Sequence, residues 1–528
     1  MDQRDAANLP RTSASHPLKI AFVPTGTRGG RIGITFCPGK KQQDALTGAW
    51  NRDLCADLDT IQASGTAAVV SLIEAEEFLS LGVVRLGEEV RTRHMDWFHL
   101  PIADVSIPSP AFEQAWAAIG TNLRSRLRQG FDIVLHCKGG LGRAGMIAAR
   151  LLVELGTEPK AAIRQVRVAR PGAIETHDQL TYVQQRATVE EARPAKTSAA
   201  VRARGRGALI GLAVGDALGT TLEFARRDSY PLLTDMIGGG PFGLRTGEWT
   251  DDTSMALALA DSLLSCNGID DADLMKRFVA WRDEGSYSSN GHCFDIGMTV
   301  SAALARWEQS GDPVAGSTDP ATAGNGSLMR LAPVALRYHD DIPALDDAAA
   351  RQSRTTHSAP EAVDACVIYA RMTASAISGG TLDEILDISG EGLTRKIADI
   401  VGGSWRGKPR QDIRASGYVA HSLEAALWCI ARTGSFAEAV LTAANLGEDA
   451  DTTAAITGQL AGALYGEGGI PQAWRHRIVG YERIGDMADQ LLSRQAVQAR
   501  PSLWAADPTT SRSPISFIRL LKERRKRS

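Results

Sequence analysis

The hydrophobic pattern of this chain changes its period once, near residue 190. Between residues 18 and 187, short apolar runs such as 67–73 and 131–136 alternate with segments of helical period, such as 146–155. This alternation is typical of an α/β layer fold. From residue 207 to about 495, almost every segment has helical period and many small residues, and strand signals are absent. We therefore expect a multidomain protein, in which an α/β domain with a central sheet precedes an all-α domain whose glycine and alanine positions let helices approach closely.

Length and composition support two domains. A chain of 528 residues is too long for one ordinary core. Residues 188–204 are rich in Glu, Ala, Arg and Lys, which is typical of a linker. We expect an α/β domain at 18–187, a linker at 188–204, a helical domain at 205–490 and a basic tail at 491–528. The tail is either a short basic amphipathic helix for an anionic surface or partner, or a solvated end.

Overall composition excludes several classes of protein. The net charge of −3 gives no general attraction to nucleic acid. The seven cysteines are scattered, without a Cys-x-x-Cys pair, which indicates reduced thiols. No apolar run reaches the roughly 18 residues of a membrane span, and the start of the chain lacks the order of a signal peptide. We expect a cytoplasmic protein.

Two oxygen-rich clusters lie about two hundred residues apart, each where a helix is expected to begin. Thr250, Asp251 and Asp252 form the first cluster, and Asp449, Asp451 and Thr452 belong to the second. Capping of the helix N-terminus explains one or two such side chains, and it remains an alternative for either cluster alone. The two clusters hold more acids than capping needs. If they face one another, their repulsion requires cations between them, and hard divalent cations prefer oxygen ligands.

A phosphate cradle is predicted between an expected strand and helix. The strand 131–136 leads to Cys137, and the loop after it is glycine-rich. Inward-facing backbone N–H groups and a helix N-terminus would bind a phosphate dianion and favour a thiolate nucleophile. Arg143 can hold two phosphate oxygens, and Asp104 is the candidate general acid. The predicted phosphate-binding residues are Lys138, Gly139, Gly140, Leu141, Gly142 and Arg143.

Three further motifs stand out in the helical half. Asp216, in an apolar glycine-rich segment, is costly unless paired, and Glu223 follows seven residues later on a similar helical face. A glycine-rich turn, Asn325, Gly326 and Ser327, can approach a phosphate or ribose closely, although a simple loop would have the same sequence. His357 is read as a core or capping residue and is given no chemistry.

Residues of about 18–187 resemble a cysteine-dependent dual-specificity phosphatase, closest to the kinase-associated, cyclin-dependent kinase inhibitor type. The resemblance rests on the segments 136–143, 101–104 and 170–176, with Gln179. It implies that Cys137 is the nucleophile, Arg143 the phosphate clamp and Asp104 the acid. This chain has Ala144 where family members usually carry Ser or Thr, whose hydroxyl stabilises the thiolate leaving group. Slow turnover, or a phosphate-binding or docking module without turnover, is the alternative.

Residues of about 205–490 resemble the ADP-ribosylglycohydrolase family, which includes the dinitrogenase-reductase-activating glycohydrolase and the ADP-ribosylarginine and ADP-ribosylserine hydrolases. The resemblance implies an all-α fold and two Mg²⁺ or Mn²⁺ ions. It also implies that Glu223 gates or activates the site. Glu448 replaces the glycine that is common before the second acidic motif, which bears on the choice of substrate. The implied metal ligands are Thr250, Asp251, Asp252, Asp449, Asp451 and Thr452.

Together these features predict a bifunctional hydrolase. The helical domain would remove ADP-ribose from a modified protein or small molecule, and the first domain would hydrolyse a phosphate monoester. Both domains would act on one substrate or successively on a phosphorylated ADP-ribose compound. Two alternatives remain: a first domain that only docks phosphoproteins, and a helical domain that only binds ADP-ribose.

Overall fold

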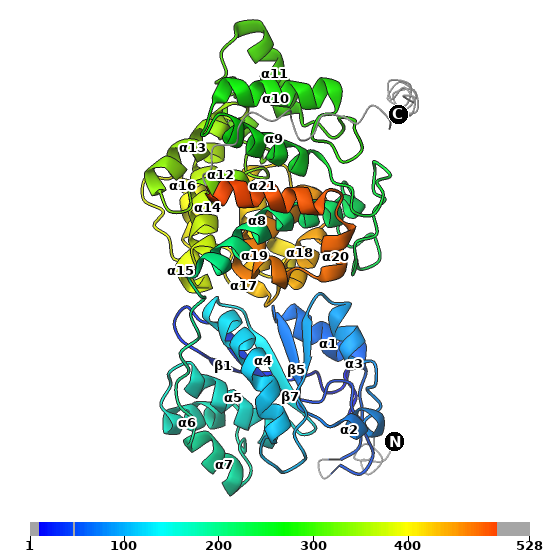
Figure 1. The fold of residues 1–528 in the computed structure, drawn as a ribbon. Coiled ribbons are helices and arrows are strands. Elements are labelled where there is room, and N and C mark those ends of the chain that lie inside the picture. The colour runs from blue at the N-terminus through cyan, green and yellow to red at the C-terminus, as the bar shows by residue number, and fades with distance from the viewer. Residues whose placement is uncertain (1–9, 46–47, 494–528) are drawn as a thin grey trace, which may run out of the picture.

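The structure is a computed structural model that describes residues 10–45 and 48–493 (Figure 1). It contains an α/β domain followed by a helical domain, as the change of hydrophobic period predicts. Helix α8 already begins at Ser198, inside the segment expected as a linker. The expected basic tail lies outside the described residues from residue 494 onward.

The first domain is built on a five-stranded sheet with the order β1-β2-β7-β5-β6. Strand β1 is antiparallel to β2, and the other neighbours are parallel. The two apolar runs read as strands are β5 and β7, next to each other inside the sheet and buried along their whole length. Burial on both faces explains their continuous apolar character. The strands are β1 (Ala21–Pro24), β2 (Arg31–Phe36), β3 (Lys41–Gln42), β4 (Trp50–Asn51), β5 (Ala68–Ser71), β6 (Asp96–His99) and β7 (Ile133–Cys137).

Helices cover this sheet, and the buried helix that follows β7 begins at Gly142. It holds Met146, Ile147, Leu151 and Leu152 in the core of the domain. The chain therefore turns from strand to helix across the predicted phosphate loop. The helices of the domain are α1 (Leu54–Ala63), α2 (Ala75–Ser80), α3 (Leu86–Arg91), α4 (Pro110–Arg128), α5 (Gly142–Glu154), α6 (Pro159–Ala169) and α7 (His177–Gln184).

The second domain is helical in the part of the chain that the structure describes, and α8 and α19 run through its centre (Figure 1). The helices are α8 (Ser198–Gly219), α9 (Asp251–Ser265), α10 (Asp271–Glu284), α11 (Met298–Ser310), α12 (Ala332–Arg337), α13 (Ile342–Arg354), α14 (Pro360–Ile377), α15 (Leu382–Leu386), α16 (Arg395–Val401), α17 (Val419–Arg432), α18 (Phe436–Ala444), α19 (Ala450–Gly469), α20 (Gln472–Arg477) and α21 (Tyr481–Ser493).

Glycines bring α8 and α19 into backbone contact, as their spacing predicts. A Cβ atom added at Gly211 would lie 2.3 Å from the carbonyl oxygen of Gly458. At Gly215 it would lie 2.1 Å from the carbonyl oxygen of Ala454. No side chain fits in this space, so the glycines fix the distance between the two helices. This distance sets how far apart any groups carried by α8 and α19 lie.

The two domains share an apolar contact at one end of the sheet. Phe131, just before β7, stacks on Trp405 with ring centroids 6.4 Å apart and meets Trp428 edge-on at 6.3 Å. Ala67, just before β5, belongs to the same apolar core as the helical domain. These residues precede their strands, whereas Cys137 ends β7. The predicted phosphate loop therefore lies at the end of the sheet away from the helical domain.

No helix within the described ranges has both the length and the apolar character needed to cross a bilayer.

Candidate active sites

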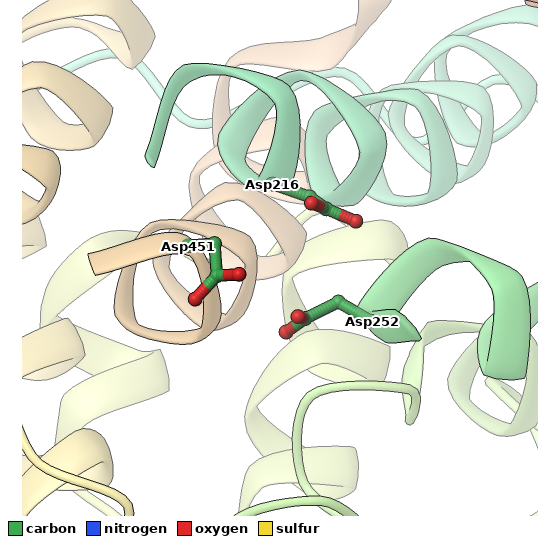
Figure 2. Close-up of side chains that lie close together, drawn as sticks. All are labelled: Asp216, Asp252 and Asp451. Atoms are coloured by element: carbon green, nitrogen blue, oxygen red, sulfur yellow. The ribbon is translucent and has the colours of Figure 1, made fainter. Parts of the chain in front are cut away.

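Three helices of the second domain bring carboxylates to one point (Figure 2). Asp216 comes from the C-terminal part of α8, Asp252 from the first turn of α9 and Asp451 from the first turn of α19. One ligand oxygen of each lies within 4.8 Å of the others, and all three side chains are buried. The two acidic clusters that the sequence places at helix N-termini therefore do face one another.

Asp216 organises the start of α9 rather than facing open space. One of its oxygens accepts hydrogen bonds from the N–H and Oγ1 of Thr250, both at 2.9 Å. The other accepts from the N–H of Thr253 at 3.0 Å and from its Oγ1 at 2.6 Å. Four donors occupy the lone pairs of this carboxylate. Asp216 is therefore a positioning residue, which explains how this acid is paired in an apolar segment.

The facing carboxylates of α9 and α19 are linked by threonines. Thr250 Oγ1 lies 3.1 Å from Asp252 Oδ2 and 3.2 Å from Asp451 Oδ2. Thr452 Oγ1 lies 3.5 Å from Asp252 Oδ2. The other oxygen of Asp252 is fully buried and has no hydrogen-bond partner among the described residues. A buried carboxylate oxygen without a donor is costly, so this atom points to a bound cation.

A second group of carboxylates adjoins the first. Glu223, Asp449 and Asp451 also place one oxygen each within 4.8 Å of one another. Glu223 Oε2 accepts from the N–H of Ala450 at 2.7 Å and of Asp451 at 3.3 Å, so it caps α19. Asn325 Nδ2 donates to Asp449 Oδ2 at 2.6 Å. Asp451 belongs to both groups and is the centre of the site.

Burial and mutual repulsion disfavour the charged forms of these acids. Burial, followed by the charge of Asp451, raises the pKa values of Asp216 and Asp449 to about 7. Burial also raises the pKa values of Asp251 and Asp252 well above their usual range, with neighbouring carboxylates adding to the effect. Protons or cations must therefore offset the charge of this cluster.

The carboxylates open into a cavity of about 750 Å³. Asp251, Asp449, Asp451, Thr452 and Glu223 line it, together with Asn325 and Gly326 of the glycine-rich turn. Other predicted site residues lie behind its wall. Thr250 and Asp252 are buried there, and the predicted substrate residue Ser327 is fully buried and bonded to Ser353 at 2.9 Å instead of facing the cavity.

Asp295 lines the cavity but is absent from the sites predicted from sequence. Burial, followed by the charge of Asp451, raises its pKa to about 9. A lone aspartate in a loop carries no spacing that marks it. Only the fold reveals that it faces Asp451.

The donor set fits divalent cations. The oxygens come from carboxylates and threonine hydroxyls, which are the ligands that Mg²⁺ and Mn²⁺ prefer. The unpartnered oxygen of Asp252 and the charge at Asp451 provide the buried negative charge that such ions would offset. Both predicted clusters contribute to this donor set.

In the first domain, Cys137 lies at the end of β7 and is buried. The N–H of Gly140 donates to its Sγ at 3.2 Å. Gly140 has φ +70°, and a Cβ atom there would lie 2.4 Å from the backbone of Thr35. The loop thus needs glycine at this position to bring this N–H to the sulfur. The roles of Cys137 as a thiolate nucleophile and of the loop as a phosphate site stay predictions.

Arg143 lies in the first turn of α5 and is held by acids. Its Nη1 and Nη2 donate to the two oxygens of Glu77 at 2.6 and 3.0 Å. Its Nη2 also lies 3.0 Å from Oδ1 of Asp104, whose side chain is 56% exposed. The structure therefore brings the predicted clamp and the predicted acid together. Glu77, which orients the clamp, belongs to a distant helix, and no motif in the sequence marks it.

Two other cations adjoin the loop. Lys40 is buried against Phe36 and Trp50, and its Nζ lies 3.5 Å from the carbonyl oxygen of Lys138. Burial lowers its pKa to about 8. Arg170 Nε donates to the carbonyl oxygen of Gly140 at 3.1 Å. These contacts fix the loop from both sides.

Comparison with known proteins assigns both domains. A model of the ADP-ribosylglycohydrolase family matches residues 197–501, and a model described as Swiss Army Knife protein, DSP-PTPase phosphatase domain, matches residues 45–189. ADP-ribosylarginine hydrolase Tri1 of Pseudomonas putida (strain GB-1) is 45% identical over 291 residues, which cover 55% of this chain and 78% of that protein. The ADP-ribosyl-dinitrogen reductase glycohydrolase of Rhodospirillum rubrum is 32% identical, over 53% of this chain and 92% of its own.

A solved structure titled ADP-ribosylglycohydrolase-related protein complex covers 56% of this chain and 99% of its own, with 39% identity and a TM-score of 0.50. These matches and the two family models agree with the division of the fold into an α/β and a helical domain. The chain belongs to the ADP-ribosylglycohydrolase family and carries a DSP-PTPase phosphatase domain ahead of its glycohydrolase domain.

Proposed function

We propose that the helical domain hydrolyses the bond between ADP-ribose and an arginine side chain of a modified protein, with two Mg²⁺ or Mn²⁺ ions as cofactors. The observation that carries this proposal is the meeting of two distant acidic helix ends on the wall of one cavity. Two relatives, 45% and 44% identical, are named ADP-ribosylarginine hydrolases, which favours arginine as the acceptor.

Six residues would hold the ions: Thr250, Asp251, Asp252, Asp449, Asp451 and Thr452. Bound divalent cations orient ribose hydroxyls and make a bound water more acidic. Asp216 keeps the first turn of α9 in place through Thr250 and Thr253. Glu223 does the same for α19 by accepting from the N–H groups of residues 450 and 451. Both helix ends are therefore pre-organised before substrate enters.

Asp295 is the acid best placed to exchange a proton with substrate. It lines the cavity, whereas Asp216 is saturated by four donors and Glu223 is occupied by the N-terminus of α19. A carboxyl group in this position can donate a proton to the guanidine nitrogen as its bond to the anomeric carbon breaks, and the resulting carboxylate can accept a proton from the water that adds to that carbon. Asn325 positions Asp449 at the same wall.

The test is release of free ADP-ribose by the full chain from peptides ADP-ribosylated on arginine or serine, with Mg²⁺, Mn²⁺ or a chelator. We expect metal-dependent release from the arginine peptide, and a loss of at least 100-fold in kcat/KM in Asp451→Ala and Asp295→Asn. Tight binding of ADP-ribose without release from either peptide would instead identify a binding module.

We also propose that the first domain hydrolyses phosphate monoesters, with Cys137 as nucleophile, Arg143 as clamp and Asp104 as acid. The Gly140 N–H on the sulfur and the proximity of Asp104 to Arg143 support catalysis over simple docking. Hydrolysis of p-nitrophenyl phosphate that is abolished in Cys137→Ser would reject the docking alternative. Phosphate binding without any hydrolysis would support it.

The two activities would occupy separate sites. The interface residue Phe131 precedes β7 and Cys137 ends it, so the phosphatase loop lies roughly 15–20 Å or more from the interface, at about 3.3 Å per residue. One reacting group cannot contact both sites at once. Coupling of the two activities therefore requires that the domains remove different modifications from one substrate, or that they act on it one after the other. It fails as a hypothesis if Cys137→Ser and Asp451→Ala each lose activity on unrelated substrates without any mutual effect.

A further inference from the structure

Two side chains that the mechanism does not use stand next to each other on the cavity wall. Phe224 follows Glu223 directly and is 67% exposed. Glu448 precedes Asp449 directly and is also exposed. Both line the cavity that holds the carboxylates. An aromatic ring and a free carboxylate therefore flank the site at its open side.

The backbone holds this pair in a fixed relation. The N–H of Phe224 donates to the carbonyl oxygen of Glu448 at 2.7 Å, and the N–H of Glu448 donates to that of Ala225 at 2.8 Å. Phe224 has φ +58° and Glu448 has φ +62°, a region that favours glycine over residues with a side chain. It is unusual for two non-glycine residues that pair through their backbones both to have this conformation. Such backbone strain concentrates at functional sites.

Both groups are available to a ligand. Within the described ranges, no arginine or lysine forms an ion pair with Glu448. Arg227, which approaches the same loop, donates instead to the carbonyl oxygens of Leu446 and Arg410 at 2.9 and 3.1 Å. The ring of Phe224 meets Phe242 edge-on, with centroids 6.3 Å apart, which holds it from one side and leaves much of it exposed.

A planar cation suits this pair. A guanidinium stacks on an aromatic ring and forms two parallel hydrogen bonds with a carboxylate. The pyrophosphate of ADP-ribose, in contrast, would be repelled by Glu448. We propose that Phe224 and Glu448 form the subsite for the arginine side chain of the substrate. This inference rests on the proposed ADP-ribosylarginine hydrolysis and names the residues that select the acceptor.

The test compares three variants with the wild-type chain. Glu448→Gly removes the carboxylate and suits the positive φ, Glu448→Gln removes only the charge, and Phe224→Leu removes only the ring. Glu391→Gln, at an exposed loop position outside the cavity lining, is the control for the loss of one negative charge. The ratio of kcat/KM for the arginine peptide to that for the serine peptide is measured, together with calorimetric binding of agmatine in the presence of ADP-ribose and Mg²⁺.

We expect Glu448→Gly and Phe224→Leu each to lower the ratio and the agmatine affinity about fivefold to tenfold, while affinity for free ADP-ribose changes less than twofold. Glu391→Gln leaves both quantities at the wild-type level. Equal ratios and equal agmatine affinities in all variants would overturn the proposal. So would a loss that falls on ADP-ribose, which would place the adenine or phosphates against Phe224.

The proposed hydrolysis and the proposed arginine subsite fail under different results. If the wild-type chain hydrolyses neither peptide, the proposed function is wrong, and agmatine binding alone decides the subsite. Absence of agmatine binding to the wild-type chain contradicts the subsite even when arginine peptides are hydrolysed.

Discussion

Replacement of Gly215 by alanine tests whether the contact between α8 and α19 sets the geometry of the metal site. The new Cβ would lie 2.1 Å from the carbonyl oxygen of Ala454, whereas ordinary contact begins at 3.4 Å. The helices must therefore separate by about 1.3 Å at this point, because neither backbone can rotate away. Asp216 follows directly on α8, and Asp451 lies one turn before Ala454 on α19.

The expected cost follows from two opposing effects. Overpacking of a dense core destabilises by about 1–3 kcal/mol, and a clash between backbones belongs at the upper end of that range. Alanine gains at most about 1 kcal/mol over glycine as a helix former. The net loss is about 2 kcal/mol, which lowers the melting temperature of a domain of roughly 300 residues by about 3 °C, at about 2.1 cal/mol/K of unfolding entropy per residue.

Differential scanning calorimetry with and without Mn²⁺ measures both consequences. The matched control is Gly468→Ala, since a Cβ atom at Gly468 meets nothing within 4 Å. We expect Gly215→Ala to melt lower than the wild-type chain and to lose most of the stabilisation by Mn²⁺, while Gly468→Ala changes neither. If the two variants have the same melting temperature and Mn²⁺ stabilises them equally, the glycine contact does not determine the geometry of the metal site.

Two further predictions concern the first domain and its interface. Burial, followed by the charge of Arg410, lowers the pKa of His94 to about 4, so the folded chain binds fewer protons there than the unfolded chain, whose histidine titrates near 6.5. The stability that depends on a neutral His94 is complete above pH 6.5 and falls as the pH drops towards 4. The acids with raised pKa values act in the opposite direction, so the His94 effect is read from the difference between the wild-type chain and His94→Gln in urea unfolding. Between pH 7 and pH 5, the wild-type chain should lose about 2 kcal/mol relative to the variant, and parallel profiles would contradict the assignment. Ala144→Ser introduces the hydroxyl that members of the resembled phosphatase family usually carry at this position, and it should raise the turnover of p-nitrophenyl phosphate about tenfold, by one charge-assisted hydrogen bond to the leaving thiolate. An unchanged kcat would show that this step does not limit turnover.

Local patterns were enough to predict the fold class and the convergence of the acids. The change of period near residue 190 separates the two domains, and buried strands such as β5 and β7 appear as continuous apolar runs. The four acids of the two clusters exceed what capping requires, and if the clusters meet, their repulsion requires cations between them. The glycines of α8 predict a close helix partner, and α19 is that partner.

Other features depend on contacts that no local pattern contains. Asp295 and Glu77 lie in segments that are distant in sequence from the groups they meet, Asp451 and Arg143, and no spacing marks either acid. Ser327 belongs to a turn that does reach the cavity, but its own side chain faces the core and bonds to Ser353. Asp216 lies among apolar residues, so the sequence predicts that it has hydrogen-bond partners. Only the fold identifies these partners as Thr250 and Thr253.

The left-handed backbone at Glu448 is likewise a property of the folded loop. The sequence shows that an acid replaces the glycine usual for the family, but not that this acid lines the cavity together with Phe224. A residue that departs from the usual backbone preference indicates a function most clearly where the structure shows which site its side chain lines.

Calorimetric titration of the full chain with Mn²⁺ tests the central claim most directly, namely that acids from α9 and α19 hold the same ions. The variants are Asp252→Asn, Asp451→Asn, the double variant, and Asp412→Asn as an exposed control. Each single substitution should weaken binding at least tenfold, and the double variant should be little worse than either one, because partners at a shared ion are not additive. Absence of Mn²⁺ binding, or independent and additive losses from the two helices, would contradict the account.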